Sequence, residues 1–372
     1  MNSNLIPNPI PNEVLRAFGL SPSALLEALP GGHINDTYLV SGRYVLQRIN
    51  HYVFPHPGEI MENMVGVTQF LQNKVRAQGG DPFREILQVV LTLDGAPVCQ
   101  DATGNFWRCT LHIDGTASFE TPDSAQMLWE AGRAFGNFQA MLSGYPADTL
   151  HEIIPDFHNT PVRVQQLKDA ASRDPKGRLQ EVAAEMEFAL SREGQAGLLT
   201  GLLAEGKLPL RVTHNDTKMS NILFDETTRK AVCVIDLDTV MPGLTAYDFG
   251  DSIRAGASTA AEDETDLNKV CFDLDLYRAY TEGFLNAAGS TLTSTELDTL
   301  PDGAWTMTYE VGIRFLADYL NGDVYFRTAH PRQNLDRARN QFHLVRQMEE
   351  RREEMGEIIR AAVAAQNAEV SC

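Results

Sequence analysis

The sequence contains no long hydrophobic segment. No apolar run approaches the roughly 18 residues that a membrane-spanning helix needs. The N-terminal residues also lack the basic region and apolar core of a secretory signal. We therefore expect a cytoplasmic protein that has no membrane partner.

Cysteines and basic residues are both scarce. The cysteines are odd in number and scattered, and none is paired at metal-ligand spacing: Cys99, Cys109, Cys233, Cys271 and Cys372. Reduced thiols are the simplest account of such a set. The chain has 31 Lys and Arg residues against 50 Asp and Glu residues, a formal net charge of −19. Because such a surface repels nucleic acid, we expect no nucleic-acid partner.

Repeats and low-complexity segments are also absent, and 372 residues suffice for two domains or one two-lobed unit. The N-terminal part alternates short apolar stretches with turn residues. This predicts a strand, a Gly turn and a returning strand over 29–40, and further strands at 44–49, 86–93, 96–100 and 106–113. Helical spacing of apolar residues predicts a helix over 13–28, with a Ser-Pro break at 21–22, and another over 58–78. Together these patterns predict a small antiparallel sheet of about five strands with a helix beside it.

The composition changes after Asp114, where helical periodicity becomes dominant. Helices are predicted at 124–142, 160–172, 178–191, 195–206, 264–288, 302–320 and 333–366. We predict an α+β fold with a β-rich N-terminal lobe, residues 1–114, and a larger, mainly helical C-terminal lobe, residues 115–372.

One segment carries chemistry, and it runs from His214 through Asn221 to Asp236. Asp216 is placed to orient an attacking hydroxyl and accept its proton. Asn221 offers an amide oxygen and Asp236 a hard carboxylate, the kinds of ligand that Mg²⁺ takes together with phosphate oxygens. The spacing H-x-D-x-x-x-x-N followed by a metal-binding Asp is that of the kinase catalytic loop.

The local context favours this interpretation over a simple turn or helix cap. Short apolar strands are predicted at 208–213, 222–224 and 231–235, so the motif lies between strands. Asp238 follows Asp236 by two residues and would either help to bind metal or contact the substrate. Asp248 and Asp251 are expected to cap the next helix or, preferably, to brace the catalytic loop.

The N-terminal lobe offers candidates for binding the nucleotide between the lobes. Gly31-Gly32-His-Ile-Asn35-Asp-Thr37 is a candidate phosphate-covering loop, in which Asn35, Thr37 and backbone N–H groups would donate to phosphate oxygens. A plain turn is the alternative. Arg48 would supply a cation for the phosphates, with Glu62 as its ion-pair partner and Glu59 as the competing choice. An exposed Arg48 at a strand edge is the alternative there.

A second cation, Arg314, interrupts an otherwise apolar helix face late in the chain. A buried Arg needs partners. Pattern alone leaves two partners equally open, a polar substrate or an internal salt bridge.

These residues resemble the aminoglycoside phosphotransferase and choline kinase family of protein-kinase-like small-molecule kinases. The resemblance lies in His214-x-Asp216-x-x-x-x-Asn221, Ile235-Asp-Leu-Asp238 and Tyr247-Asp-Phe-Gly250. It implies a two-lobed protein-kinase-like fold that uses ATP and Mg²⁺. It also implies that Leu111 and Ile113 meet adenine in the hinge between the lobes.

Further segments are similar to the N-acetylhexosamine 1-kinases of this family, over residues 29 to 330. Those segments are Gly32 to Tyr38, Tyr44 to Asn50, Thr213 to Lys218, Ile235 to Gly243, Tyr247 to Arg254 and Arg314 to Tyr325. The similarity implies phosphorylation of the anomeric hydroxyl of N-acetylglucosamine or N-acetylgalactosamine. Asp216 would be the base, Asn221 and Asp236 the metal ligands, and Arg314 and Tyr325 sugar contacts.

Three departures from the wider kinase pattern concern the phosphate contacts: Arg48 in place of Lys, Asp-Leu-Asp in place of Asp-Phe-Gly, and a phosphate loop with few glycines. Two other functions are therefore considered. One is a kinase of an amino alcohol or aminoglycoside, for which a carboxylate-lined or aromatic acceptor pocket is expected. The other is a non-catalytic nucleotide-binding pseudokinase, which the intact Asp216, Asn221 and Asp236 argue against. We expect a monomer.

Overall fold

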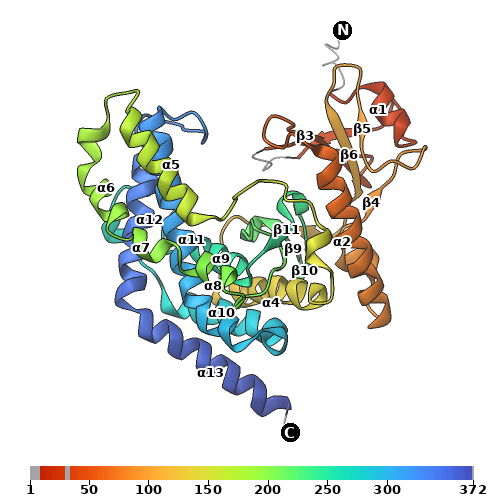
Figure 1. The fold of residues 1–372 in the computed structure, drawn as a ribbon. Helices are drawn as coiled ribbons and strands as arrows, with labels where there is room; N and C mark the ends of the chain where they lie inside the picture. The colour runs from red at the N-terminus through yellow and green to blue at the C-terminus, as the bar shows by residue number, and fades with distance from the viewer. Residues whose placement is uncertain (1–8, 30–33, 371–372) are drawn as a thin grey trace.

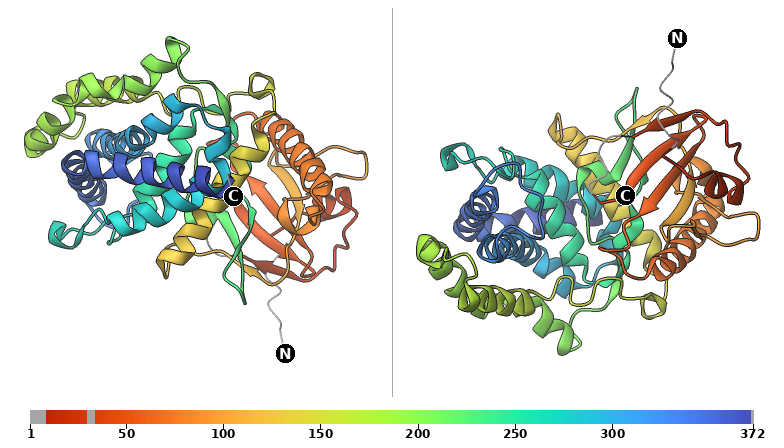
Figure 2. Two further views of the ribbon diagram at one scale, coloured as in Figure 1. Left: turned by 90° about the horizontal axis from the view of Figure 1, so that it is seen from below. Right: turned by 90° about the horizontal axis from the view of Figure 1, so that it is seen from above.

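The computed structural model describes residues 9–29 and 34–370. A β-rich N-terminal region lies beside a larger, mainly helical C-terminal region (Figure 1). The views from below and above show the same two regions side by side (Figure 2). This is the α+β architecture that the sequence predicts. Within the described part of the chain, no helix is both long and apolar enough to cross a membrane.

The N-terminal region is built on one antiparallel sheet. Within the described residues it has six strands in the order β1-β2-β3-β6-β4, and β5 pairs with β6 outside this path. The strands are β1 (Leu26–Ala28), β2 (Asp36–Val40), β3 (Tyr44–Ile49), β4 (Val89–Val90), β5 (Cys99–Gln100) and β6 (Phe106–Leu111). The helices beside the sheet are α1 (Asn12–Ala17), α2 (Pro57–Ala77) and α3 (Pro82–Glu85).

The two faces of this sheet belong to different hydrophobic clusters. Leu46 of β3 and its register partner Cys109 of β6 pack with α1. Ile49, three residues further along β3, packs with α2 instead. Since neighbouring residues of a strand point to opposite faces, Gln47 and Arg108 lie on the α2 face and Arg48 lies on the α1 face. This alternation decides which cations reach the candidate site.

The helix expected over 13–28 is wrong in its second half. Helix α1 ends at Ala17, and Gly19 follows with a positive φ of 70°. Residues 26–28 form β1, where Leu26 pairs with Val40 of β2. Pairing with the sheet edge outweighs the helical spacing of the apolar residues, because a short segment takes its conformation from its neighbours.

The C-terminal region is dominated by helices. They are α4 (Ala125–Leu142), α5 (Thr160–Arg173), α6 (Ala183–Leu190), α7 (Glu193–Ala196), α8 (Leu198–Ala204), α9 (Thr245–Gly256), α10 (Leu274–Ala288), α11 (Ser294–Asn321), α12 (Gln333–Glu350) and α13 (Arg352–Val370). Most lie close to the predicted positions, but the helix expected over 264–288 begins only at Leu274, and no range was predicted for α9. Short 3₁₀ turns are η1 (Ala147–Thr149), η2 (Leu179–Val182), η3 (Met219–Asn221), η4 (Leu237–Thr239), η5 (Leu267–Lys269) and η6 (Gly289–Thr291).

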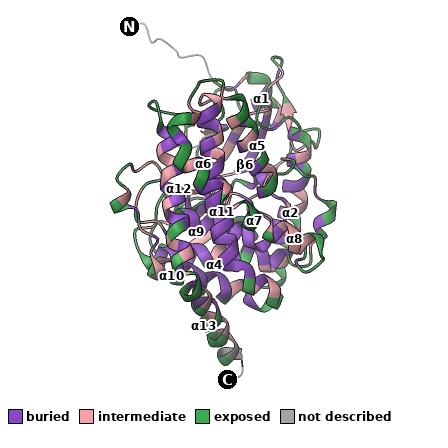
Figure 3. Ribbon diagram, turned by 60° about the vertical axis from the view of Figure 1, so that its left-hand side comes forward, coloured by how far each residue is buried: buried purple, intermediate pink, exposed green. Residues whose placement is uncertain are grey.

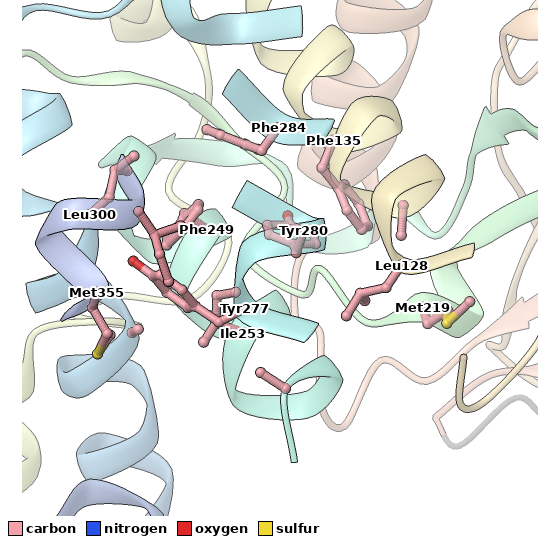
Figure 4. Packing of buried hydrophobic residues seen from close by; sticks show 14 of the residues in the cluster. Leu128, Phe135, Met219, Phe249, Ile253, Tyr277, Tyr280, Phe284, Leu300 and Met355 are labelled. Atoms are coloured by element: carbon pink, nitrogen blue, oxygen red, sulfur yellow. The ribbon is translucent and has the colours of Figure 1, made fainter. Parts of the chain in front are cut away.

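The main core of this region lies between α4, α9 and α10. Phe135, Phe249, Tyr280 and Phe284 meet there, and Leu300 of α11 joins them (Figure 4). The ring of Phe249 contacts those of Tyr280 and Phe284 edge to face, at centroid distances of 5.6 and 5.4 Å. Edge-to-face contacts of this kind add to the stability given by burial. The core thereby fixes the position of α9, the helix that follows the segment with Asp236.

Helix α11 runs for 28 residues and is buried over most of its length (Figure 3). It begins at Ser294 with a capping box between Thr293 and Glu296, eight residues before the predicted start. Pro301 lies inside the helix, and the prediction began after it because an interior proline removes a backbone hydrogen bond. The helix expected over 333–366 is two helices, separated at Arg351.

Short strands surround the motif, and those at 211–213, 222–225 and 231–234 lie where strands were predicted. They are β7 (Thr116–Ala117), β8 (Arg211–Thr213), β9 (Ile222–Asp225), β10 (Ala231–Val234) and β11 (Met241–Gly243). Strand β9 forms a hairpin with β10 and also pairs with β7, while β8 pairs with β11. The catalytic motif therefore lies between β8 and β9, and the Asp236 segment follows β10 directly.

Candidate active site

The loop between β8 and β9 is held by Asp248 at the start of α9. The carboxylate of Asp248 accepts hydrogen bonds from the backbone N–H groups of His214, at 2.9 Å, and Asn215, at 2.7 Å. The side chain of Gln139 donates a further hydrogen bond at 2.7 Å. The predicted bracing role of Asp248 is therefore confirmed. Asp251 pairs with Arg254 of the same helix instead.

Helices α9 and α11 approach closely enough to keep Asp248 in place. A Cβ atom on Gly250 would lie 2.2 Å from the carbonyl oxygen of Gly303, and one on Gly303 would lie 2.2 Å from that of Ala246. Only glycine fits at such an approach, because the atoms that a Cβ would meet are backbone atoms. Helix α9, which carries Asp248, is thus held closely against α11.

His214 joins the catalytic loop to the metal-binding segment. Its Nδ1 accepts from the backbone N–H of Asp216 at 3.3 Å, and its Nε2 donates to the carbonyl of Ile235 at 2.9 Å. The rings of Phe135 and Phe138 pack edge-on against the imidazole. This network assigns the proton to Nε2. Through one side chain it also fixes the spacing between Asp216 and the residue before Asp236.

Asp216 faces two side chains of its own loop. Lys218 forms an ion pair with it at 2.8 Å, and the amide of Asn221 donates to its Oδ2 at 3.1 Å. Burial opposes ionisation of Asp216, but Lys218 and the hydrogen bond from Asn221 outweigh it and lower the pKa of Asp216. The Asp216 side chain is 28% exposed, so solvent partly screens the pair. Asp216 is therefore a carboxylate that a substrate can reach.

Asp236 has no hydrogen-bond donor among the described residues, and its side chain is exposed. The backbone at Asp236 is left-handed, with φ 59°. Desolvation by the surrounding chain, followed by repulsion from Asp238 and Asp216, raises the pKa of Asp236 to about 6. A crowded carboxylate without a donor suits a cation.

Asn221 and Asp236 together fit a divalent metal. The backbone N–H of Ile235, next to Asp236, donates to the carbonyl of Asn221 at 2.9 Å, so the two residues are neighbours. No group of three His, Cys, Asp or Glu side chains in the described residues forms a complete metal cage. Mg²⁺ does not need one, because it takes one or two protein ligands and completes its shell with waters and phosphate oxygens.

Asp238 connects the N-terminal and C-terminal regions. Its two carboxylate oxygens accept hydrogen bonds from Arg108 of β6 and from Asn35, the latter at 2.7 Å. Arg108 and Asp238 form a salt bridge with side chains only 1% and 4% exposed. Asn35 also accepts from the backbone N–H of Asn50 at 3.0 Å. Protein partners thus occupy Asp238 and Asn35, and their predicted substrate and phosphate contacts stay predictions.

The predicted ion pair between Arg48 and Glu62 is wrong. Arg48 pairs with Asp36 of the adjacent strand, and Glu62 contacts His151 at 2.7 Å. Both side chains are exposed, and the structure does not bring them together. The reason is the strand alternation, since Arg48 lies on the α1 face while Glu62 belongs to α2. Arg108, on the α2 face, is the N-terminal cation that reaches the carboxylates.

The remaining nucleotide candidates are only partly free to bind a ligand. Residues 31–33 of the expected phosphate loop lie outside the described residues, and the Thr37 hydroxyl accepts from Gln47 at 3.1 Å. Leu111 ends β6, and its N–H donates to the carbonyl of Gln88 at 3.0 Å. Ile113 is buried, and within the described part of the chain its backbone N–H has no acceptor. That free N–H lies where the hinge was predicted.

Arg314 of α11 and Tyr325, the two predicted sugar contacts, lie close to each other. The Arg314 guanidinium carbon lies 5.9 Å from the ring centre of Tyr325 and 5.6 Å from those of Phe157 and Phe326. Arg314 makes no hydrogen bond or ion pair with the described residues. Desolvation, followed by repulsion from the nearby Arg314, lowers the pKa of Arg163. Two guanidinium groups therefore share this region, with aromatic rings around one of them.

Sequence reasoning missed several residues of this arrangement. Lys218 was visible inside the motif, two residues after Asp216. Arg108 interrupts an apolar strand, and Glu310 interrupts an apolar helix face four residues before Arg314, so both were recognisable as charges in buried positions. Arg163 gave no signal, because exposed arginines are common on helices.

A cavity of about 320 Å³ lies behind the metal-binding segment, between α2, α3, α4 and β10. Leu237, Phe138 and Cys233 line it, together with Arg84 and Arg133 at its polar side. None of the carboxylates of the candidate site contributes to its wall. The cavity therefore lies outside the candidate active site.

The fold and the site define a protein-kinase-like phosphotransferase. A β-rich region lies beside a helical one, and a carboxylate, an amide and a second carboxylate follow the kinase spacing. The model of the APH phosphotransferase enzyme family matches residues 26–280, and the chain belongs to this family. It is a small-molecule kinase, of a family that uses ATP with a divalent metal ion.

Solved structures agree on the fold. The microcompartment-associated aminopropanol kinase matches with a TM-score of 0.63 at 16% identity, covering 93% of this chain and 97% of that one. An aminoglycoside phosphotransferase from Alicyclobacillus acidocaldarius gives 0.58 at 15%, covering 100% and 98%. Amicoumacin kinase hAmiN, in complex with AMP-PNP, Ca²⁺ and Ami, gives 0.56 at 13%, covering 91% and 92%. The predicted protein-kinase-like fold is thereby confirmed.

Proposed function

We propose that the protein transfers the γ-phosphate of ATP to the anomeric hydroxyl of an N-acetylhexosamine, which gives ADP and the sugar 1-phosphate. Asp216 would accept the proton of the attacking hydroxyl. Asn221 and Asp236 would hold Mg²⁺, which supplies charge neutralisation on the phosphate oxygens. The segments similar to N-acetylhexosamine 1-kinases support this assignment.

The state of Asp216 suits this role. Its lowered pKa keeps it ionised at neutral pH, so it is ready to accept a hydroxyl proton. Lys218, whose side chain is 46% exposed, is bound to Asp216 without an acceptor substrate. Its ammonium can turn to the transferring phosphoryl group once a substrate hydroxyl takes its place at Asp216. A cation there would offset the negative charge that builds up during transfer.

The charge around Arg314 and Tyr325, which we call the acceptor side, is the observation on which the choice of substrate rests. Arg163 and Arg314 lie together there, and Glu310 is the buried carboxylate near them. Two cations beside one ion-paired carboxylate repel a cationic acceptor. They suit a neutral molecule with many hydroxyl oxygens, because a guanidinium donates hydrogen bonds and accepts none. The aromatic rings of Phe157 and Tyr325 give apolar surface for a sugar ring.

Nucleotide binding is supported by the free backbone N–H of Ile113. A buried N–H without a partner costs free energy, and a ring nitrogen of adenine would satisfy it. The backbone N–H of Ile113 would not contribute to the selection of a sugar. We therefore assign Leu111 and Ile113 to the nucleotide and Arg314 and Tyr325 to the acceptor.

A kinase of amino alcohols or aminoglycosides is the second candidate. The solved structures of similar fold include proteins named aminopropanol kinase and aminoglycoside phosphotransferase. An acceptor with an ammonium group needs carboxylates or open aromatic faces, and here Arg314 already lies beside the aromatic rings. The third candidate, a non-catalytic nucleotide-binding protein, is disfavoured by the complete set of Asp216, Asn221 and Asp236.

An acceptor panel tests the proposal. ADP release is measured with Mg²⁺-ATP and one of N-acetylglucosamine, N-acetylgalactosamine, galactose, glucosamine, choline, 1-amino-2-propanol or kanamycin. We expect the N-acetylhexosamines to give the highest kcat/KM. Phosphorus NMR of the product then locates the new phosphate, which should couple to the anomeric proton. Preference for an amine-bearing acceptor, or phosphate on another hydroxyl, would overturn the proposal.

A further inference from the structure

A buried histidine connects α11 to the catalytic loop. His158 lies just before α5, and its Nδ1 is 3.0 Å from Oε1 of Glu310 on α11. Its Nε2 is 3.3 Å from the carbonyl oxygen of Asn215, the residue before Asp216. The side chains of His158 and Glu310 are 5% and 0% exposed. Neither residue belongs to the kinase motif.

Both partners of His158 offer hydrogen-bond acceptors. The Asn215 carbonyl can only accept, and Glu310 accepts a second hydrogen bond from Thr160 at 2.7 Å. Burial opposes ionisation of Glu310, but the hydrogen bond and charge of His158 lead the effects that outweigh it and lower the pKa of Glu310. Since a carbonyl cannot donate, the bond to Asn215 needs the ring N–H at Nε2. The ring of His158 therefore links a buried carboxylate of α11 to the backbone of the loop between β8 and β9.

Asn215 is the residue whose carbonyl His158 holds. Its backbone is left-handed, with φ 66°, a conformation that costs free energy in a residue other than glycine. Its N–H donates to Asp248, and its side-chain amide donates to the carbonyl of Thr239 at 2.9 Å. Its carbonyl accepts from His158. Contacts on all three groups impose the strained conformation, and the direction of Asp216 follows from it.

Glu310, which His158 contacts, lies close to the acceptor side around Arg314. Glu310 and Arg314 are one helical turn apart on α11, so their side chains share a face. Arg314 is also among the charges that lower the pKa of Glu310. Two hydrogen bonds thus run from Glu310 through His158 to Asn215, and Arg314 acts on Glu310 through its charge. These interactions join the side chain proposed to meet the acceptor with the loop that carries the proposed base.

We propose that His158 and Glu310 are positioning residues, which hold Asn215 and thereby aim Asp216 at the acceptor bound beside Arg314. The proposal rests on the proposed function in one respect, because the oxygen at which Asp216 is aimed is that of the acceptor. A purely structural role is the alternative, since a buried ion pair often contributes little net stability. The two roles differ in their effect on kcat and on the state of the His158 ring.

Glu310→Leu separates them, because leucine is of similar size but cannot hold the imidazole by a hydrogen bond, so the bond from His158 to Asn215 is weakened. We expect kcat to fall roughly 100-fold, as for a misplaced reacting group, while the KM for ATP stays within about twofold. His158→Phe should give a similar loss, and the double variant should be no worse than either single variant, because the pair acts as one unit. Glu310→Gln should keep kcat within about threefold, because its amide can donate to Nδ1 of His158 and its oxygen can accept from Thr160, which leaves the Nε2–H of His158 for Asn215.

The state of the His158 ring gives a readout that a structural role would not move. Nitrogen-15 NMR of the unaltered protein should show a hydrogen-bonded N–H at Nε2 of His158, which donates to the carbonyl of Asn215. Glu310→Gln should keep that signal, and Glu310→Leu should weaken it.

Asp302→Asn is the matched control, because Asp302 is another buried carboxylate of α11 with an arginine partner, Arg352. It should lower Tm without changing kcat. Glu310→Leu with kcat within about twofold of the unaltered protein would overturn the proposal, and so would an equal loss of kcat in Glu310→Gln. If no sugar is phosphorylated, the proposed function fails. The positioning role is then decided by the ring state and by the slow hydrolysis of Mg²⁺-ATP, which should fall in Glu310→Leu and not in Glu310→Gln.

Discussion

The side-chain amide of Asn221 donates to Asp216 twice, at 2.8 Å to the backbone oxygen and 3.1 Å to Oδ2. The amide nitrogen therefore faces the proposed base, and the amide oxygen is left to face a cation. One side chain thus serves both parts of the site. Asp216 is held where a hydroxyl can approach it, beside the metal ligands and not among them.

Asp216→Ala should remove catalysis and leave nucleotide binding intact. We expect kcat to fall by about 10²- to 10⁴-fold, the usual contribution of a general base, because the hydroxyl proton has no acceptor. Calorimetric titration should give a Kd for Mg²⁺-ATP within about threefold of the unaltered protein. Asp298→Ala, an exposed carboxylate of α11, is the control and should leave kcat unchanged. A loss in kcat of less than tenfold would contradict the role of Asp216.

The pKa of Asp236 predicts a pH dependence of metal binding. Its pKa in the folded, metal-free protein is raised from 3.8 to about 6, so a proton must leave before a cation binds below that pH. Mg²⁺ affinity measured by titration should therefore fall as the pH drops from 7 to 5. In Asp236→Asn the remaining weak affinity should lose this dependence.

The same shift predicts an effect on the stability of the metal-free protein. Between pH 3.8 and 6 the folded state binds more protons than the unfolded state, so the free energy of unfolding decreases as the pH rises through this window. Asp236→Asn removes this loss. Its Tm should exceed that of the unaltered protein at pH 7.5 and match it near pH 4. A Tm difference that does not change with pH would contradict the raised pKa.

The Arg108–Asp238 pair and the Arg48–Asp36 pair should differ sharply in their contribution to stability. Arg108→Met leaves a buried carboxylate with Asn35 as its remaining donor, and it should lower the free energy of unfolding by about 3–5 kcal/mol. Arg48→Met breaks an exposed pair and should cost less than about 1 kcal/mol. Urea unfolding of both variants measures this. A change in the KM for ATP in Arg48→Met would support the predicted contact of Arg48 with the phosphates.

Arg314 should affect the acceptor and not the nucleotide. Arg314→Ala removes a guanidinium that donates to substrate oxygens, and loss of a charged hydrogen bond costs about 1.5–3 kcal/mol. The KM for the acceptor should rise roughly 10- to 100-fold, and the KM for ATP should stay unchanged. Arg346→Ala, which removes a cation from the ring of Phe188, is the control. Equal changes in both KM values would place Arg314 outside the acceptor site.

The sequence predicted the motif and most regular elements because both follow local rules. Asp216 and Asn221 lie five residues apart in one loop, so their contact is set by the motif itself. Helix α2 and strand β3 have clear periodicity, and both were predicted within one or two residues. The predicted ATP-dependent small-molecule kinase is supported at the level of the family.

Long-range contacts could not be predicted in the same way. Which face Arg48 occupies depends on the register of β3 with β6, and a shift of one residue would exchange it with Gln47. The role of Arg108 depends on its contact with Asp238, 130 residues away in the sequence. His158 and Glu310 are 152 residues apart, and although Glu310 stands out as a charge on an apolar helix face, no sequence pattern pairs it with His158. Such partners become visible only when the chain is folded.

The length of α11 has a consequence for how acceptor preference can change. This single helix carries Gly303, which packs against α9, Glu310, which is linked to the catalytic loop, and Arg314 of the acceptor side. Tilting that helix to admit a larger molecule would misalign the reacting groups, so diversification has to come from parts attached to its end. The 323–332 loop, which holds Tyr325, is the obvious candidate. Grafting a different loop there should alter which acceptors are used while leaving Tm and the slow hydrolysis of ATP unaltered.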